Sequence, residues 1–226
     1  MNVNKSLINH LKKFIVDERK ELFDTKIQER TKHITIVLEN IYQGRNISAS
    51  IRSADCFGIQ DVHIIENNNF FNQDTSVSIG SEKWISLFRH NKKKENTKET
   101  ISKLKKDGYQ IIVTTPHAKK NTLFDVDISK KIALLFGSEG SGCSEIALNL
   151  ADEQIKIPLY GFSESFNISV SVALCLQHLT YKLRDSNLNW KLKTNEKEEI
   201  MINWLKRSIR SSEKIEREFL KNLKTK

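Results

Sequence analysis

Glycine and small polar side chains gather at two neighbouring points late in the chain. Three of the eight glycines fall within six positions, in the run Leu135-Phe-Gly-Ser-Glu-Gly-Ser-Gly-Cys-Ser144. A second run of this kind is Ile157-Pro-Leu-Tyr-Gly-Phe-Ser-Glu-Ser-Phe-Asn-Ile-Ser-Val-Ser171. Each run ends an apolar, strand-like segment and leads into a helix-like segment, which is where α/β proteins bind ligands. The pattern predicts a small-molecule site.

The first run matches neither of the common nucleotide-binding loops. No Lys-Ser or Lys-Thr pair follows its last glycine, so it is not a P-loop. Its glycines are spaced G-x-x-G-x-G, whereas the dinucleotide fingerprint is G-x-G-x-x-G. The expected ligand is therefore neither ATP nor NAD.

A third segment with chemical potential lies earlier, in Asn46-Ile-Ser-Ala-Ser-Ile-Arg-Ser-Ala-Asp-Cys-Phe-Gly58. Asn46 is suited to cap a helix that begins at Ile47. Arg52 lies six residues further on, too late for a phosphate site in the first turn, and small residues flank it. Considered alone, an arginine in this position is most often part of a surface ion pair.

These segments lie in a region where apolar, β-branched runs alternate with helical patterns, which predicts a mostly parallel sheet with helices on both faces. The expected strands are residues 33–38, 61–65, 84–88, 109–114, 131–136 and 154–158. The expected helices are residues 47–57, 97–106, 144–151 and 168–183. Gly58 and Gly108 follow two of these helices, as C-terminal stops do.

The flanks differ from this central region. Residues 1–32 and 186–226 carry apolar positions at helical spacing between many charges, which predicts basic helical extensions around a domain of residues 33–185. The net charge is +9, and residues 206–226 contain eight Lys or Arg and three Glu. This balance favours a polyanionic partner. The alternatives are a genome-wide bias in composition and a solvated helix face.

Other classes of protein are disfavoured. Cys56, Cys143 and Cys175 are far apart, and no C-x-x-C or H-x-x-x-H pair occurs, so neither disulfides nor a metal site is expected. No apolar run of about 18 residues and no signal-peptide pattern is present. We expect a soluble, cytoplasmic protein that does not bind membranes.

Together the three segments closely resemble the three motifs of the SpoU or TrmH family, the 2′-O-ribose methyltransferases of the SPOUT superfamily. The similarity covers roughly residues 33–183, in the same order and spacing. Ser138, Cys143 and Phe166 depart from the residues most often found in the family, and none of the three replaces a candidate catalytic group. The basic flanks, with runs such as Glu18-Arg-Lys-Glu-Leu-Phe23, further resemble the tRNA enzymes that methylate the D-loop guanosine at position 18.

The resemblance implies a C-terminal trefoil knot in the sheet, whose loops form a pocket for S-adenosylmethionine. The cofactor-binding positions it implies are Thr114, Gly137, Glu139, Ile157 and Phe166. Glycine would let the backbone approach the cofactor, and the two apolar side chains would contact the base. Without the resemblance, core packing is the usual role of Ile157 and Phe166.

The catalytic positions that the resemblance implies are Asn46, Arg52, Glu139, Ser165 and Asn167. Because a guanidinium keeps its proton in proteins, Arg52 is better suited to hold a phosphate and stabilise the developing alkoxide than to act as a base. A phosphate-assisted base role stays open. Asn167 has an alternative role as the cap of the helix that begins at Ile168.

The expected function is thus S-adenosylmethionine-dependent methylation of a ribose 2′-hydroxyl in tRNA, with the guanosine at position 18 as target, by a homodimer. The helix at residues 168–183 is apolar on more than one face, which favours a dimer interface. Two alternatives remain: a ribosomal RNA methyltransferase of the same family and a catalytically silent RNA-binding homologue.

Overall fold

The computed structural model describes residues 3–224, which form two compact units. One unit comprises residues 31–190 and contains all three motifs. The other is formed by the two flanks together, residues 3–30 and 191–224. The domain boundaries at residues 32 and 185 stay a prediction.

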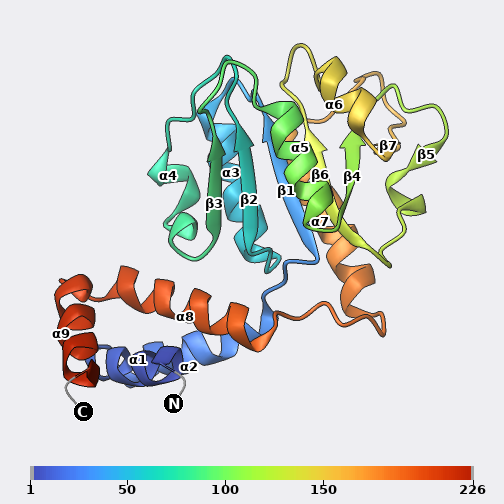
Figure 1. Ribbon diagram of the computed structural model, residues 1–226. Helices are drawn as coiled ribbons and strands as arrows, with labels where there is room; N and C mark the ends of the chain where they lie inside the picture. The colour runs from blue at the N-terminus through green and yellow to red at the C-terminus, as the bar shows by residue number, and fades with distance from the viewer. Residues whose placement is uncertain (1–2, 225–226) are drawn as a thin grey trace. The chain divides into compact units, whose positions relative to one another are not determined.

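A seven-stranded sheet is the centre of the larger unit (Figure 1). Its order is β3-β2-β1-β6-β4-β7-β5, and every ladder is parallel, so all strands end at the same edge. The strands are β1 (Ile34–Glu39), β2 (Asp61–Ile65), β3 (Ser86–His90), β4 (Tyr109–Thr114), β5 (Asn121–Thr122), β6 (Lys131–Phe136) and β7 (Glu153–Lys156).

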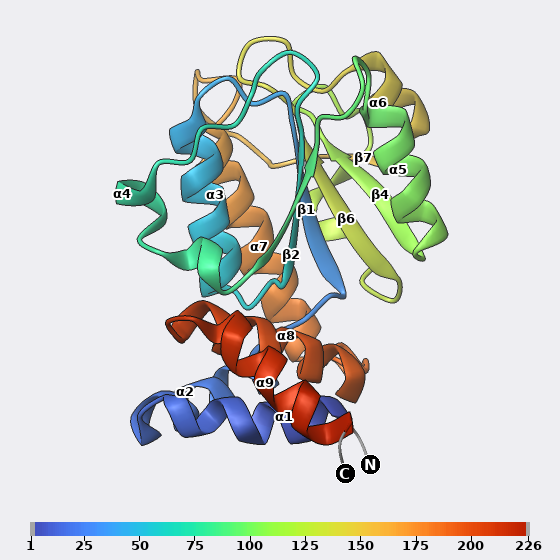
Figure 2. The ribbon, with the colours of Figure 1, turned by 60° about the vertical axis from the view of Figure 1, so that its left-hand side comes forward.

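Helices cover both faces of the sheet, as the sequence predicts. α3 (Gly44–Cys56) and α7 (Ile168–Arg184) lie on one face, and α5 (Thr97–Lys106) and α6 (Glu145–Leu150) on the other (Figure 2). A short helix, α4 (Thr75–Ser78), and two 3₁₀ turns, η3 (Ser81–Lys83) and η4 (Leu123–Asp125), lie in the connections.

The strands alternate between two cores because successive side chains of a strand point to opposite faces. Ile36 and Leu38 of β1 belong to the core that contains Ile51 of α3 and Leu176 of α7. Val37, between them, belongs to the core under α5 and α6. These side chains are less than 1% exposed, which explains why β1 reads as a continuous apolar run.

The predicted strands at 61–65, 109–114 and 131–136 and the helix at 97–106 have the predicted bounds. The strand predicted at 84–88 is shifted to Ser86–His90, because the 3₁₀ turn after Gly80 extends to Trp84, whose backbone N–H donates to the Ser81 carbonyl at 3.0 Å. α4 and the two-residue β5 were not predicted, since such short elements carry no periodic pattern.

The main elements of the flanking unit are all helices. They are α1 (Val3–Leu11), η1 (Lys12–Phe14), α2 (Asp17–Lys26), η2 (Ile27–Glu29), α8 (Thr194–Ser208) and α9 (Ser212–Lys224). Trp204 of α8 is 3% exposed and packs with its ring 5.5 Å from that of Phe23. The Arg30 guanidinium lies 5.4 Å from the centroid of the same indole. The amphipathic segments at the two ends of the chain thus share one core.

Two further properties bear on function. Among residues 3–224, no helix is long and apolar enough to cross a membrane. Within the same residues, no three side chains of His, Cys, Asp or Glu are grouped so that they could hold a metal ion.

Candidate active site at the carboxyl ends of β1, β4 and β6

Three connections at one edge of the sheet carry the candidate residues. The first leads from β1 to α3, the second from β6 to α6, and the third from β7 to α7. In the sheet, β1 and β6 are neighbours, and only β4 separates β6 from β7. The sheet order therefore brings together motifs that are far apart in the sequence.

Asn46 does not cap α3, so that prediction is wrong. The helix begins at Gly44, with Gln43 as its N-cap, and Asn46 lies inside the first turn. Its side chain is 8% exposed and is used for long-range bonds instead. Asn46 Nδ2 donates to Glu139 Oε1 at 2.6 Å, and Asn46 Oδ1 accepts from Asn167 Nδ2 at 3.1 Å.

Glu139 and Asn167 thus meet on Asn46. The second oxygen of Glu139 accepts from the backbone N–H of Tyr42 at 3.2 Å. Asn167 also caps α7, as its alternative role predicts, because its Oδ1 accepts from the Ser169 N–H at 2.9 Å. One amide side chain therefore fixes the start of α7 and links it to α3.

Arg52 and Ser165 are not joined to this network. Both are exposed, and neither side chain makes a hydrogen bond or ion pair within the part of the chain that the structure describes. Arg52 is therefore not the surface ion pair that its sequence context alone favours. Its guanidinium is free to contact a substrate.

The glycine loop after β6 folds back on itself. Ser138 and Gly142 exchange two backbone hydrogen bonds of 3.0 Å, and Gly142 has a φ of +68°. A Cβ on Gly137 would lie 2.1 Å from the Gly142 carbonyl carbon and 2.2 Å from the Cys143 nitrogen. Glycine is required at 137 because the loop's own backbone leaves no room for a side chain. Residues 139–142 are exposed and present their backbone to a ligand.

The other candidate cofactor residues flank this loop. Thr114 ends β4, and its hydroxyl donates to the Leu135 carbonyl at 3.1 Å. Ile157 follows β7 and packs partly against the core, as its sequence alternative predicts. Phe166 remains 41% exposed, so much of its ring is open to a ligand. The set combines a free backbone with apolar surface, which suits an adenosyl group.

Sequence reasoning missed Glu39, which organises the far end of the glycine loop. Its side chain is 1% exposed at the end of β1. Glu39 Oε1 accepts from the hydroxyls of Ser144 (2.7 Å) and Thr97 (2.6 Å), and Oε2 accepts from the Ser144 N–H (2.9 Å). The available signal was a carboxylate directly after an apolar strand, next to Asn40.

Cys143 is held between the same elements. Its Sγ lies 3.7 Å from the Thr114 carbonyl, to which it donates. Burial, with the nearby Glu39 carboxylate, raises the pKa of the Cys143 thiol to about 12. The thiol is therefore neutral at physiological pH and serves to pack the loop rather than to react.

Known proteins are similar to this chain in sequence. The family model described as the SpoU rRNA Methylase family matches residues 33–177. A tRNA (guanosine(18)-2′-O)-methyltransferase of Borreliella burgdorferi is 38% identical over 209 residues, which cover 92% of this chain and 94% of that protein. An enzyme of the same name from Thermus thermophilus is 32% identical over 160 residues, covering 71% and 80% of the two chains.

The fold has solved counterparts. The crystal structure of the A. aeolicus TrmH/SpoU tRNA modifying enzyme superposes with a TM-score of 0.77 at 22% identity, and the match covers 86% of this chain and 98% of that one. The SpoU methyltransferase AviRb from Streptomyces viridochromogenes, solved in complex with AdoMet, gives a TM-score of 0.59 over 72% and 62% of the chains. Since the family model matches residues 33–177, which is more than half of the chain, the protein belongs to the SpoU methylase family.

Proposed function

We propose that the protein transfers a methyl group from S-adenosylmethionine to the ribose 2′-hydroxyl of the guanosine at position 18 in the D-loop of tRNA. The observation that carries this proposal is the similarity to the B. burgdorferi enzyme over nearly the whole length of both chains. Because the match covers 92% of this chain, it extends into both flanks.

The geometry of Asn46, Glu139 and Asn167 supports a catalytic role for the carboxyl edge of the sheet. A ribose hydroxyl must be held and its proton removed as the new bond forms. Three polar side chains fixed by mutual hydrogen bonds provide preorganised donors and acceptors for a ribose. Ser165, two residues before Asn167, adds an exposed hydroxyl to the same segment.

Arg52 is the charged group of this site in our proposal. It is exposed on α3, six residues after Asn46, and its side chain is unpaired among residues 3–224. A guanidinium keeps its proton and binds phosphate oxygens in a bidentate manner. We assign to Arg52 the binding of the phosphate next to the target ribose and the stabilisation of charge on the 2′-oxygen.

Thr114, Gly137, Glu139, Ile157 and Phe166 would hold the cofactor. They fit an adenosyl group because the loop offers an exposed backbone at residues 139–142 and Phe166 has a partly exposed ring. S-adenosylmethionine supplies an electrophilic methyl group on a sulfonium. The residues of this chain bind it, exclude water from it and orient the acceptor.

Three further features belong to the proposal: a trefoil knot, a homodimer and a cytoplasmic location. The knot is supported by the sheet order, in which β6 lies between β1 and β4 and the chain from β7 returns to α7 on the face of α3. The dimer is supported by apolar side chains exposed on α7. The location follows from a tRNA substrate.

A ribosomal RNA substrate is the second candidate. A 23S rRNA (guanosine-2′-O-)-methyltransferase of Pasteurella multocida is 28% identical over 157 residues, covering 68% of this chain and 62% of that protein. The identity is lower and the match shorter than for the tRNA enzymes of B. burgdorferi and T. thermophilus, so tRNA is favoured. A catalytically silent homologue is disfavoured because Asn46, Glu139 and Asn167 are assembled by direct hydrogen bonds.

The test uses the purified protein with methyl-labelled S-adenosylmethionine and a tRNA transcript. We expect labelling of a transcript with guanosine at position 18 and none of a transcript with 2′-deoxyguanosine there. A ribosomal RNA fragment serves as the competing substrate. Labelling at another nucleotide, or of ribosomal RNA in preference to tRNA, would contradict the proposal, and labelling of neither RNA would favour a silent homologue.

A further inference from the structure

A cavity separate from the candidate active site opens at the end of the edge strand β3. It has a volume of about 320 Å³ and is enclosed by the end of β3, the loop at residues 91–96 and the first two turns of α5. We call it the β3–α5 pocket. It is large enough for a phosphate group with part of a nucleotide.

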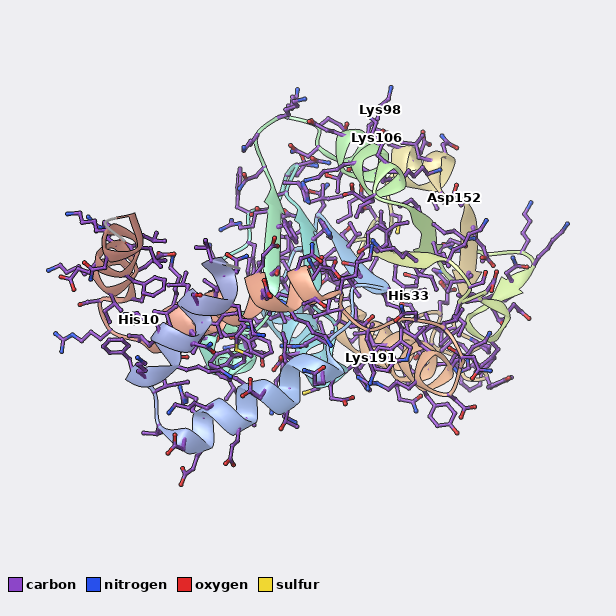
Figure 3. The ribbon with its side chains drawn as sticks, turned by 60° about the horizontal axis from the view of Figure 1, so that its bottom comes forward. His10, His33, Lys98, Lys106, Asp152 and Lys191 are labelled. Atoms are coloured by element: carbon purple, nitrogen blue, oxygen red, sulfur yellow. The ribbon has the colours of Figure 1, made fainter. Side chains whose placement is uncertain are left out.

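Cationic side chains dominate the lining of this pocket. The lining contains Arg89, Lys92, Lys93 and Lys103 and a single carboxylate, Glu99, which pairs with Lys93 at 2.6 Å. Lys92 and Lys103 form no ion pair within residues 3–224. Outside the pocket, Lys98 and Lys106 extend from the same helix into solvent (Figure 3). The pocket therefore has the chemistry of an anion site, in which the ammonium groups of Lys92 and Lys103 are available to bind the anion.

Buried groups hold the pocket in shape. Glu66, 2% exposed, accepts from Arg89 Nε at 2.8 Å, from Arg89 Nη2 at 2.6 Å and from Asn91 Nδ2 at 3.1 Å. Burial alone would raise the pKa of Glu66, but the hydrogen bonds from Arg89 and the Phe71 backbone lower it on balance, so the carboxylate stays charged. The first residues of the loop are therefore fixed to the sheet.

Asn96 fixes the other end of the loop. It is 5% exposed, and its side chain accepts from the Lys93 N–H at 3.1 Å and donates to the Lys93 carbonyl at 2.8 Å. Its amide also donates to Asn67 Oδ1 at 3.0 Å. A basic loop that is only a solvated surface has no need of buried supports at both ends.

The pocket lies at the same edge of the sheet as the candidate active site. β3 and β1 are separated by β2, so their ends lie about 10 Å apart across the sheet. A polynucleotide whose ribose lies at Asn46 and Glu139 could therefore place another of its phosphates at β3. We propose that the β3–α5 pocket binds a backbone phosphate of the RNA substrate, at a position away from the reacting nucleotide. This inference rests on the proposed function.

The experiment compares the full-length protein with Lys92→Ala, Lys103→Ala and the double variant. Lys130→Ala removes an exposed lysine just before β6, at the opposite edge of the sheet, and is the matched control. Binding of tRNA is measured over a range of salt concentrations, together with cofactor affinity and kcat at saturating tRNA.

We expect the double variant to bind tRNA on the order of tenfold more weakly, with a salt slope lower by about one unit, as loss of one phosphate contact implies. Cofactor affinity and kcat should match wild type, as should all properties of the control. Glu99→Gln should act in the opposite direction and tighten tRNA binding, because it releases Lys93. A purely structural role of these residues would not produce opposite signs.

A competition experiment with inorganic phosphate at constant ionic strength distinguishes two occupants of the pocket, a phosphate of RNA and a free anion. Phosphate should displace tRNA from wild type better than chloride does, and the double variant should lose this difference. Unchanged tRNA affinity and salt slope in the double variant would overturn the proposal, whether or not phosphate binding is lost. Wild-type protein that binds tRNA through this pocket but transfers no methyl group would refute the proposed function alone.

Discussion

Asn46 shows how far the role of one side chain depends on a helix boundary. Had α3 begun at Ile47, the Asn46 amide would have been used locally as a cap; because the helix begins at Gly44, the amide is free to join Glu139 and Asn167. Gly44, the first residue of the helix, must be glycine because a Cβ there would lie 2.6 Å from the Asn72 carbonyl oxygen. The catalytic assignment of these residues therefore rests on long-range contacts.

Arg52→Ala should abolish most methyl transfer while cofactor affinity stays near wild type. The guanidinium is exposed, and our proposal assigns it to the phosphate and the 2′-oxygen of the acceptor, so its loss should lower kcat by a factor of about 10² or more. Arg52→Lys keeps the charge but not the bidentate fork and should recover only part of the rate. The rate of methyl transfer to tRNA is measured for both variants by single-turnover kinetics. A rate for Arg52→Ala within a few-fold of wild type would rule out the assigned role.

Gly137→Ala should weaken S-adenosylmethionine binding and lower the unfolding temperature. Its Cβ would collide with the backbone of Gly142 and Cys143, so the loop must open. Gly140→Ala is the matched variant, because a Cβ there meets no atom within 4 Å, and its unfolding temperature should change little. Calorimetry and thermal unfolding provide the comparison. Equal stability losses in the two variants would contradict the steric explanation.

At the scale of elements, α7 has two apolar sides with different roles. Val172, Leu176 and Leu179 are fully buried against the sheet. On other sides of the helix, Val170 is 43%, Leu174 38% and Tyr181 69% exposed. Apolar exposure of this extent on a helix that already covers a sheet favours a contact with a second copy.

The protein should therefore sediment and scatter light as a dimer at micromolar concentration. Val170→Glu combined with Leu174→Glu should shift it to the 26.2 kDa monomer, because two charges would be buried without partners. Leu22→Glu, at a side chain 50% exposed on α2, is the control and should leave the dimer intact. A monomeric wild-type protein would refute the α7 interface.

For the whole molecule, the net charge of +9 is the property most relevant to a tRNA partner. Removing residues 206–226 would delete a basic tail but also α9, whose Phe219 ring stacks 4.7 Å from His10 of α1. Charge neutralisation is thus a cleaner test than truncation, because it leaves this packing in place. Lys206 is already paired with Glu216 at 2.6 Å and is not a suitable target.

The combined variant Arg210→Gln, Lys214→Gln and Arg217→Gln should weaken tRNA binding and flatten its salt dependence. These side chains are exposed and would act through phosphates, whose counterions are released on binding. Cofactor affinity should be unchanged, since the candidate pocket lies in residues 31–190. Glu213→Gln with Glu218→Gln is the counterpart and should strengthen binding. If tRNA affinity and salt slope do not respond to either variant, α9 is only a solvated helix.

The sequence by itself determined the bounds of several elements, although not of α3, which begins three residues earlier than predicted. The apolar runs of β2, β4 and β6 and the amphipathic pattern of α5 predicted their bounds, because burial on both faces or on one stripe leaves a direct mark on the residues. The three motifs likewise identified the family from local spacing. β5 and the exact position of β3 were not predicted. The position of β3 depends on the turn geometry around Gly80.

Only the tertiary structure decided which of the candidate residues meet. Asn46 bonds to residues 93 and 121 positions away, and these contacts depend on the sheet order that places β6 beside β1. Glu39 is another case: its two oxygens accept from Ser144 and Thr97 across two different connections. Sequence periodicity reports which face of an element is buried, but strand order is set by how all the elements pack at once. For this reason the family could be read from the residues, whereas the hydrogen-bonded site could not.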